Sequence, residues 1–128
     1  MDRSLLQADA DRLVGIRRIG RAFADTTRVR ILASLRDGER CAAHFAALLA
    51  VDPATVTRHV KVLREAGLVV TRRRARRAYL SRAQPDSPLW LAMDGLAEGA
   101  PELEEDCIFL DASERADARH EDVPPIAT

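Results

Sequence analysis

The segment from Val51 to Leu68 constrains the fold most, because it specifies both ends and both faces of a single helix. Asp52 is a favoured N-cap residue, Pro53 suits the first helical position, and Gly67 suits the left-handed residue that ends a helix. The apolar residues between these ends recur at helical spacing: Val56, Val60 and Leu63. The sequence therefore predicts a short helix with one face packed against a core.

The opposite face of this predicted helix carries basic and hydroxyl side chains. At about 100° per residue, Arg58 and Lys61 fall roughly opposite the apolar stripe. Thr55 and Thr57 lie on its flanks, whereas His59 lies nearer the apolar edge. Such a helix fits the major groove of DNA, where arginine binds guanine through two hydrogen bonds and threonine reaches a phosphate or a thymine methyl. A solvated surface helix has the same pattern, so the neighbouring segments decide between the two interpretations.

The neighbouring segments favour a DNA-binding fold. Residues 41–50 predict a second short helix, and the brief connection that follows makes the pair a helix-turn-helix. Residues 68–72 and 77–81 have the composition of two strands on either side of a basic tip, which predicts a β-hairpin wing. The arginines of this predicted wing are Arg72, Arg73, Arg74, Arg76 and Arg77. The predicted fold class is mainly α with a β-hairpin wing, a winged helix-turn-helix.

The remaining segments predict helices before and after this unit. A first helix is expected from Ser4 to about Ala24, and a second from Asp25 or Thr26 to near Gly38. After a break at residues 84–88, the helical spacing of Leu89, Met93 and Leu96 predicts a last helix. We expect this last helix to form a dimer interface together with the first helix. The expected domains are a winged-helix and dimerisation domain at residues 1–110 and an acidic, poorly ordered tail at residues 111–128.

The chain resembles the ArsR (arsenical-resistance repressor) family of winged-helix bacterial transcription regulators. The resemblance rests on residues 23–32, 38–41 and 55–69, and the last of these runs is highly specific. It implies a homodimer that represses a promoter by binding double-stranded operator DNA and releases it when a ligand or an oxidant changes the dimer. It also implies that DNA is contacted by the residues matching the family's DNA-reading positions: Thr55, Thr57, Arg58 and His59.

The net charge of zero conceals two halves of opposite sign. Residues 1–83 carry 18 Lys and Arg against 8 Asp and Glu, whereas residues 84–128 carry 2 against 12. A basic body suits a polyanion such as DNA, and the acidic end either stays away from DNA, folds back on the basic surface, or only adds solubility. The sequence shows no apolar run long enough to span a bilayer and no signal peptide, so a cytoplasmic protein without a membrane partner is expected.

The sensing site is open at the level of sequence. Metal-sensing members of the family carry Cys-x-Cys where this chain has Cys41, Ala42 and Ala43. The second cysteine of this pair is missing, whereas arsenic binding of the usual kind needs three thiolates. Cys41 follows Arg40 at a predicted helix start, which favours a thiolate, whereas acidic neighbours disfavour one at Cys107. Three interpretations follow: inert thiols, a thiol switch of Cys41 with Cys107, or an arsenite or divalent-metal site on Cys41, His44 and Cys107.

No catalytic motif is present, so an enzyme is not expected. The chain lacks a Gly-rich phosphate loop, a serine nucleophile elbow, and paired carboxylates or histidines at catalytic spacing. The alternatives to an inducible repressor are a ligand-independent regulator and a winged helix that contacts an acidic protein partner through its arginines. Binding to random duplex DNA across a salt series separates DNA binding from protein contact, because only phosphate contacts give a steep salt dependence.

Overall fold

The computed structural model describes residues 3–122 as six α-helices, one 3₁₀ turn and a three-stranded antiparallel sheet. The helices are α1 (Arg3–Phe23), α2 (Thr26–Ser34), α3 (Ala42–Leu49), α4 (Pro53–Glu65), α5 (Pro88–Ala97) and α6 (Pro101–Asp122), and the 3₁₀ turn η1 (Leu35–Asp37) follows α2. The strands are β1 (Arg40–Cys41), β2 (Val69–Arg74) and β3 (Arg77–Arg82), in the order β1-β3-β2. This arrangement confirms the predicted winged helix-turn-helix.

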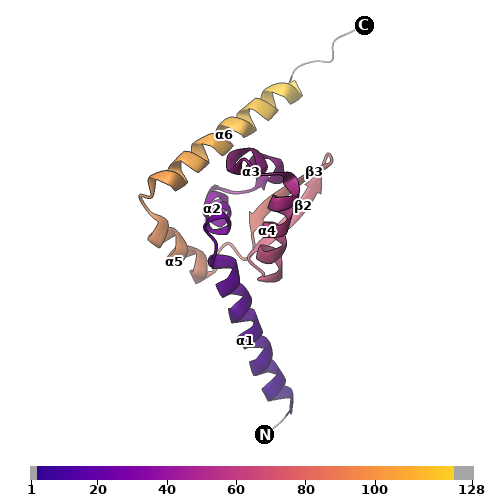
Figure 1. Ribbon diagram of the computed structural model, residues 1–128, viewed down its shortest axis with the longest axis vertical. Helices are drawn as coiled ribbons and strands as arrows, with labels where there is room; N and C mark the ends of the chain where they lie inside the picture. Colours follow the sequence, from indigo (N-terminus) through magenta and orange to yellow (C-terminus); the bar gives the residue numbers. More distant parts are fainter. Residues whose placement is uncertain (1–2, 123–128) are drawn as a thin grey trace.

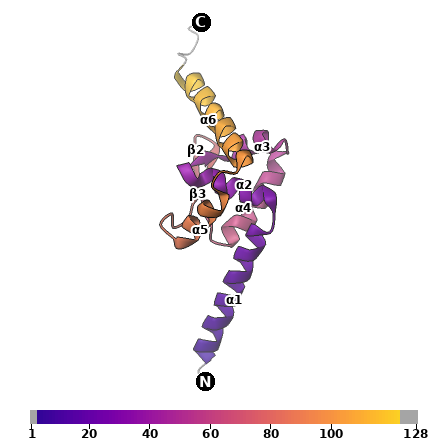
Figure 2. The same cartoon turned by 90° about the vertical axis from the view of Figure 1, so that its left-hand side faces the viewer.

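The elements pack around α2, which lies between the helix-turn-helix and the C-terminal helices (Figure 1). One side holds α3, α4 and the hairpin of β2 and β3, and the other side holds α5 and α6. α1 extends away from this body in both views (Figures 1 and 2). The largest fully buried apolar side chains are Phe45, Ile31, Leu32, Leu35, Leu63, Leu80 and Leu110. Because these come from α2, η1, α3, α4, β3 and α6, one core fixes the positions of both α4 and the hairpin.

The helix ends follow the capping residues of the sequence. The Asp52 carboxylate accepts a hydrogen bond from the backbone N–H of Thr55 at 2.9 Å, which caps α4 and lowers the pKa of Asp52. Gly67 adopts φ +72°, and the next residue, Leu68, donates its N–H to the carbonyl of Leu63 at 3.0 Å. Asp25 caps α2 in the same way as Asp52 caps α4, by accepting from the N–H of Arg28. The predicted boundaries of α4 are therefore confirmed.

The hairpin turns through two residues that rarely adopt left-handed geometry. Ala75 and Arg76 have φ +50° and +68°, and they connect Arg74 to its strand partner Arg77. Positive φ at both central residues is typical of a type I′ turn, which normally uses asparagine and glycine. The chain therefore keeps a strained tip that presents an arginine.

We expect Ala75→Gly to raise the free energy of unfolding by about 0.5–1 kcal/mol, because glycine removes the Cβ clash of the left-handed conformation. Urea unfolding followed by circular dichroism measures the change. Ala78→Gly, in β3 outside the turn, is the matched control and should lower stability instead, since glycine weakens a strand. Equal losses in both variants would contradict the assigned turn strain.

Two segments differ from the sequence prediction. Cys41 lies in β1 and at the N-cap position of α3, rather than inside the helix, because its backbone pairs with Tyr79 of β3. The residues expected to form a poorly ordered tail continue α6 as far as Asp122, so the expected boundary at residue 110 falls inside a helix. Contacts with arginines distant in the sequence hold this part of α6, and local composition does not reveal them. The expectation for Val123–Thr128 lies outside the described residues.

Candidate nucleic-acid interface

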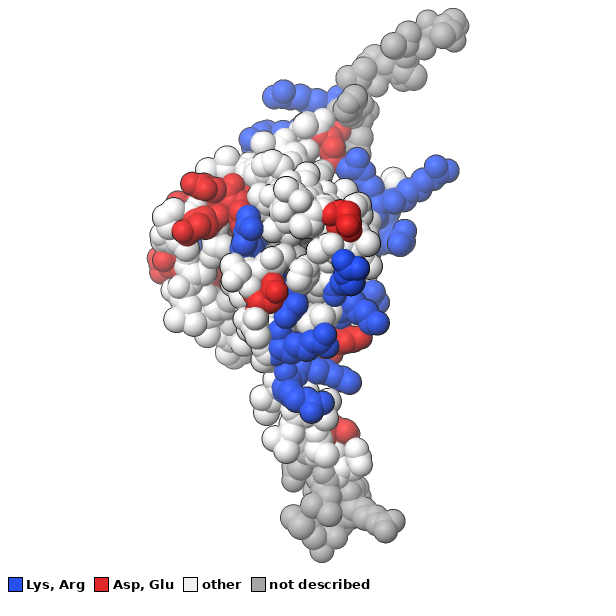
Figure 3. Space-filling model, viewed as in Figure 1, with Lys and Arg blue, Asp and Glu red and all other residues white. Residues whose placement is uncertain are grey.

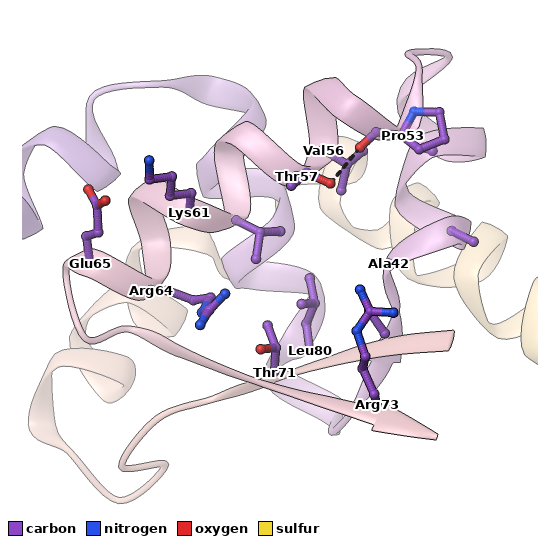
Figure 4. A pocket seen from close by; sticks show the side chains of 14 residues that line it. Ala42, Pro53, Val56, Thr57, Lys61, Arg64, Glu65, Thr71, Arg73 and Leu80 are labelled. Carbon is purple, nitrogen blue, oxygen red and sulfur yellow. Dashed lines mark hydrogen bonds between the residues drawn. The ribbon is translucent and has the colours of Figure 1, made fainter. Parts of the chain in front are cut away.

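The outward face of α4 is open and rigidly supported. Arg58 and Lys61 are exposed, and the Arg58 guanidinium donates to the Thr55 hydroxyl at 3.0 Å. The Thr57 hydroxyl donates to the carbonyl of Pro53 at 3.0 Å, and the side chain of Thr57 is exposed (Figure 4). Val56 on the same helix is buried in the core. The helix therefore presents donors of different lengths from a fixed backbone.

A groove separates α4 from the hairpin. Its lining comes from α3, α4, β2 and β3 and combines small residues such as Ala42 with longer side chains. Lys61 and Arg64 of α4 and Arg73 of β2 belong to this lining (Figure 4). Arg64 was not singled out from the sequence, because its position beside the hairpin depends on how the sheet packs. The groove thus brings basic groups of the helix and of the wing onto one surface.

The five wing arginines are not equivalent. Arg72 makes two hydrogen bonds to Glu39, at 2.8 and 3.1 Å, and Arg77 binds Asp117 of α6. Arg74 stacks over the ring of Tyr79 with its guanidinium carbon 4.7 Å from the ring centroid. Within residues 3–122, no hydrogen bond or ion pair is found for the exposed side chains of Arg73 and Arg76. These last two are therefore the wing side chains most available for a phosphate.

The charge division of the sequence is also a division in space. Basic side chains gather along α4, the hairpin and the adjoining end of α1, whereas acidic side chains gather where α5 meets α6 (Figure 3). The second half of α6 nevertheless returns to the basic body. Arg40 of β1, only 3 % exposed, binds Asp111 at 2.7 Å and Glu114 at 3.3 Å. The acidic segment thus neutralises selected arginines and leaves the α4 face open.

Asp117 is the residue of α6 that reaches the wing. Its carboxylate binds His44 Nε2 at 2.6 Å and also the guanidinium of Arg77. Desolvation opposes ionisation of this carboxyl, but the hydrogen bonds from His44 and Arg77 outweigh it and lower the pKa of Asp117 below its ordinary value of 3.8. A group with a lowered folded pKa stabilises the fold above its unfolded pKa, and this contribution is lost as the pH falls through the folded pKa.

We expect Asp117→Asn to raise the affinity for random duplex DNA by about two- to threefold, because it frees the charge of Arg77 for phosphate. Fluorescence anisotropy at fixed salt measures this change. Thermal unfolding from pH 6 to pH 3 should also show a smaller loss of stability in the variant than in the wild type. Glu105→Gln, an exposed position on α6, is the control for removing one negative charge. Equal gains in both variants would assign the effect to net charge instead.

The two cysteines are free and line different pockets. Cys41, 2 % exposed, lies beside His44 and Asp117, and its sulfur is 3.9 Å from the Arg77 guanidinium. Cys107 is half-buried beside α2 and α5, ten residues before Asp117 on α6, which is a rise of about 15 Å. Burial raises the pKa of the Cys107 thiol, so desolvation is the main cause rather than the neighbouring carboxylates expected from the sequence.

The described residues contain no group of three or more His, Cys, Asp or Glu side chains placed to hold a metal ion. Cys41 and His44 share one pocket, and Cys107 lines another. The part of the chain that the structure describes also contains no helix that is both long enough and apolar enough to cross a bilayer.

His59 points to α1 and α2 rather than to the open face of α4. Its ring is half-buried, and Nδ1 lies 3.3 Å from a guanidinium nitrogen of Arg28. Arg28 also donates to the carbonyls of Arg21 and Ala22, and it thereby holds the last turn of α1 against α4. The sequence placed His59 near the apolar edge, but it did not reveal Arg28, which lies 31 residues away.

Comparison with known proteins supports the fold and gives the family. Residues 25–71 match the model of the bacterial regulatory protein, arsR family. The chain is 30% identical over 108 residues to the arsenic resistance transcriptional regulator ArsR1 of Pseudomonas putida, covering 84% of this chain and 82% of that protein. It is 47% identical over 53 residues to the HTH-type transcriptional regulator CmtR of Mycobacterium bovis, covering 41% of this chain and 45% of that protein.

A solved structure agrees with both matches. The chain superposes on a homodimeric winged helix-turn-helix DNA-binding domain from Mycobacterium bovis with a TM-score of 0.63 and 30% identity, over 70% of this chain and 84% of that one. The residues matched by the family model, 25–71, span α2, α3, α4 and the beginning of β2. The chain therefore belongs to the ArsR family, whose members are DNA-binding transcriptional regulators and not enzymes.

Proposed function

We propose that this regulator is a homodimeric repressor that binds double-stranded operator DNA in the cytoplasm and dissociates when an inducer reacts at Cys41. The open basic face of α4 beside the arginine hairpin carries this proposal. Arg58, Thr55 and Thr57 would meet base edges and nearby phosphates in the major groove, and the wing would contact the backbone. A protein partner in place of DNA predicts little DNA binding at any salt concentration.

Exposed apolar side chains support the dimer. Leu91 and Leu96 on α5 are 79% and 90% exposed, and Leu13 and Ile16 on α1 are also exposed. An apolar pocket lies beside them and is lined by Phe23, Val29, Leu89, Met93, Leu96 and Leu103. A second copy would cover these surfaces, as the homodimeric state of the related Mycobacterium bovis domain also suggests. Analytical ultracentrifugation should give a dimer, and Leu96→Glu should weaken it.

The surroundings of Cys41 support sensing at this position. The thiol lies at the base of the wing, next to Arg77, which Asp117 holds in place. A bulky adduct or a bound metalloid at Cys41 would displace Arg77 and so disturb the hairpin. His44 lines the same pocket and offers a second ligand for a divalent metal or arsenite. The relatives ArsR1 and CmtR are both named as transcriptional regulators, and the name of ArsR1 refers to arsenic resistance. Cys107 would act only after a rearrangement that brings it to Cys41.

The test uses the DNA upstream of the protein's own coding sequence. Anisotropy is measured on this duplex and on a random duplex, across a salt series, with and without arsenite, zinc, peroxide and a polysulfide. We expect tighter binding to the upstream DNA and release by at least one compound. Cys41→Ser should bind but no longer be released, whereas Cys107→Ser should be released normally. If the inducer releases Cys41→Ser from DNA as readily as it releases the wild type, this thiol has no part in the mechanism. If the wild type binds DNA and none of the compounds releases it, the protein is a ligand-independent regulator.

Arg73→Ala is expected to lower affinity on operator and random DNA by the same factor, about fivefold at 0.15 M salt, because the exposed charge of Arg73, which has no ion-pair partner within residues 3–122, is available for a phosphate. The salt dependence should also become less steep. Arg72→Ala is the matched control, since its charge is already bound to Glu39, and it should have the smaller effect. A loss confined to the operator would show that Arg73 reads bases.

A further inference from the structure

The second flank of α4, on the side away from the wing, faces an open basic pocket. It lies between the end of α1 and α4 and has a volume of about 360 Å³. Its lining includes four basic residues and one acidic residue: Arg21, Arg28, Arg58, Lys61 and Glu65. Asp25 nearby is already engaged, because it caps α2 and pairs with Arg28. The pocket therefore has an excess of positive charge and is suited to an anion.

The hydrogen bonds at the pocket determine the proton on His59. The guanidinium of Arg28 has only donors, so the His59 Nδ1 atom at 3.3 Å must accept. The neutral imidazole then carries its proton on Nε2. Within the described residues this nitrogen has no protein partner, and the ring lines the pocket. His59 is thereby prepared as a hydrogen-bond donor to an anion.

The dimensions of DNA identify the anion. A helix with its side chains is about 10–12 Å across, and the major groove is about 12 Å wide, so an inserted helix has one phosphate backbone at each flank. One flank of α4 faces the groove toward the wing and the other faces this pocket, and Lys61 of the outward face lines both. We propose that a backbone phosphate of duplex DNA binds in the pocket between α1 and α4, on Arg21, Lys61 and His59. This inference rests on the proposed function and gives His59 a phosphate-binding role instead of a base-reading one.

Arg21 provides the first test, because its side chain is exposed and the sequence did not single it out. Arg21→Ala should weaken binding to operator and random DNA by the same factor, about fivefold, and should lower the slope of log affinity against log salt by about 1. Arg36→Ala is the matched control, since Arg36 is also exposed but lies in η1, outside both basic surfaces. An Arg21→Ala variant that behaves like Arg36→Ala would overturn the proposal.

His59 provides the second test. His59→Ala should lose affinity equally on both DNAs, whereas His59→Gln should retain most of it, because glutamine can accept from Arg28 and donate to a phosphate. A loss confined to the operator would instead make His59 a base reader and would contradict the proposal. Single methylphosphonate substitutions in the upstream duplex locate the contact: one neutral site should weaken the wild type but not Arg21→Ala.

These outcomes are distinct from failure of the proposed function. If the wild type shows no salt-dependent DNA binding, the repressor proposal fails as a whole. If Arg73→Ala weakens binding while Arg21→Ala and His59→Ala do not, only the phosphate pocket is rejected. Circular dichroism of each variant establishes that α1 and α4 remain folded.

Discussion

Asp106→Ala is expected to lower the free energy of unfolding by about 3 kcal/mol. Asp106 is 4% exposed and accepts two hydrogen bonds from Arg30 of α2, both at 2.9 Å. Removing the carboxylate leaves the partly buried guanidinium of Arg30 without its partner. Because this pair attaches α6 to α2, α6 should also exchange its amide hydrogens faster in the variant. Urea unfolding and hydrogen exchange measure both effects.

The controls for Asp106 separate this ion pair from general loss of helix. Glu105→Ala removes an exposed carboxylate from the preceding position and should change stability by less than about 0.5 kcal/mol. The double variant Arg30→Met with Asp106→Leu should recover most of the loss, since apolar pairs often replace a buried ion pair without cost. Equal destabilisation by Glu105→Ala would contradict the assigned role of Asp106.

Arg58→Ala is expected to reduce affinity for the operator by about 1–3 kcal/mol while changing affinity for random DNA far less. The guanidinium projects from the exposed face of α4 and is oriented by the Thr55 hydroxyl at 3.0 Å. Two hydrogen bonds to one guanine depend on this planar group, and a non-cognate duplex does not supply them. Anisotropy on the upstream and random duplexes measures the difference.

Arg58→Lys is the matched variant for this prediction, because lysine keeps the charge but loses the planar pair of donors. It should retain binding to random DNA and still lose operator affinity. A similar loss on both duplexes in Arg58→Ala would mean that Arg58 binds only phosphate, and the reading role would then pass to Thr55 or Thr57.

The sequence was sufficient wherever local chemistry decides structure. Asp52 and Gly67 predicted both ends of α4, because a cap and a left-handed residue act within a few positions. The spacing of Val56, Val60 and Leu63 predicted its buried face, and all three are buried. The strand composition around the arginine cluster likewise predicted the hairpin.

The sequence was insufficient where distant residues meet. The acidic composition after Asp111 suggests a solvated tail, yet Arg40 and Arg77 bind this segment and keep it helical against the body. Arg40 and Asp111 are 71 positions apart, and no local pattern relates them. The same holds for Arg28 and His59: the helical spacing placed His59 near the apolar edge of α4, but no local pattern relates its ring to Arg28. Such pairs depend on the distances between helices, which the packing of the core sets, and a local sequence pattern does not predict them.

The docking of Arg40 has a practical consequence for preparing shorter versions of this protein. A fragment cut at residue 110 would keep every element of the winged helix but would lose the carboxylates of Asp111 and Glu114. The guanidinium of Arg40, which is 3% exposed in the full chain, would then lose both carboxylates of α6 and keep the hydrogen bond to the carbonyl of Ser34 and the ion pair to Asp37. Expression of the DNA-binding half alone should therefore yield an aggregation-prone product, and extending the fragment to residue 122 should cure it.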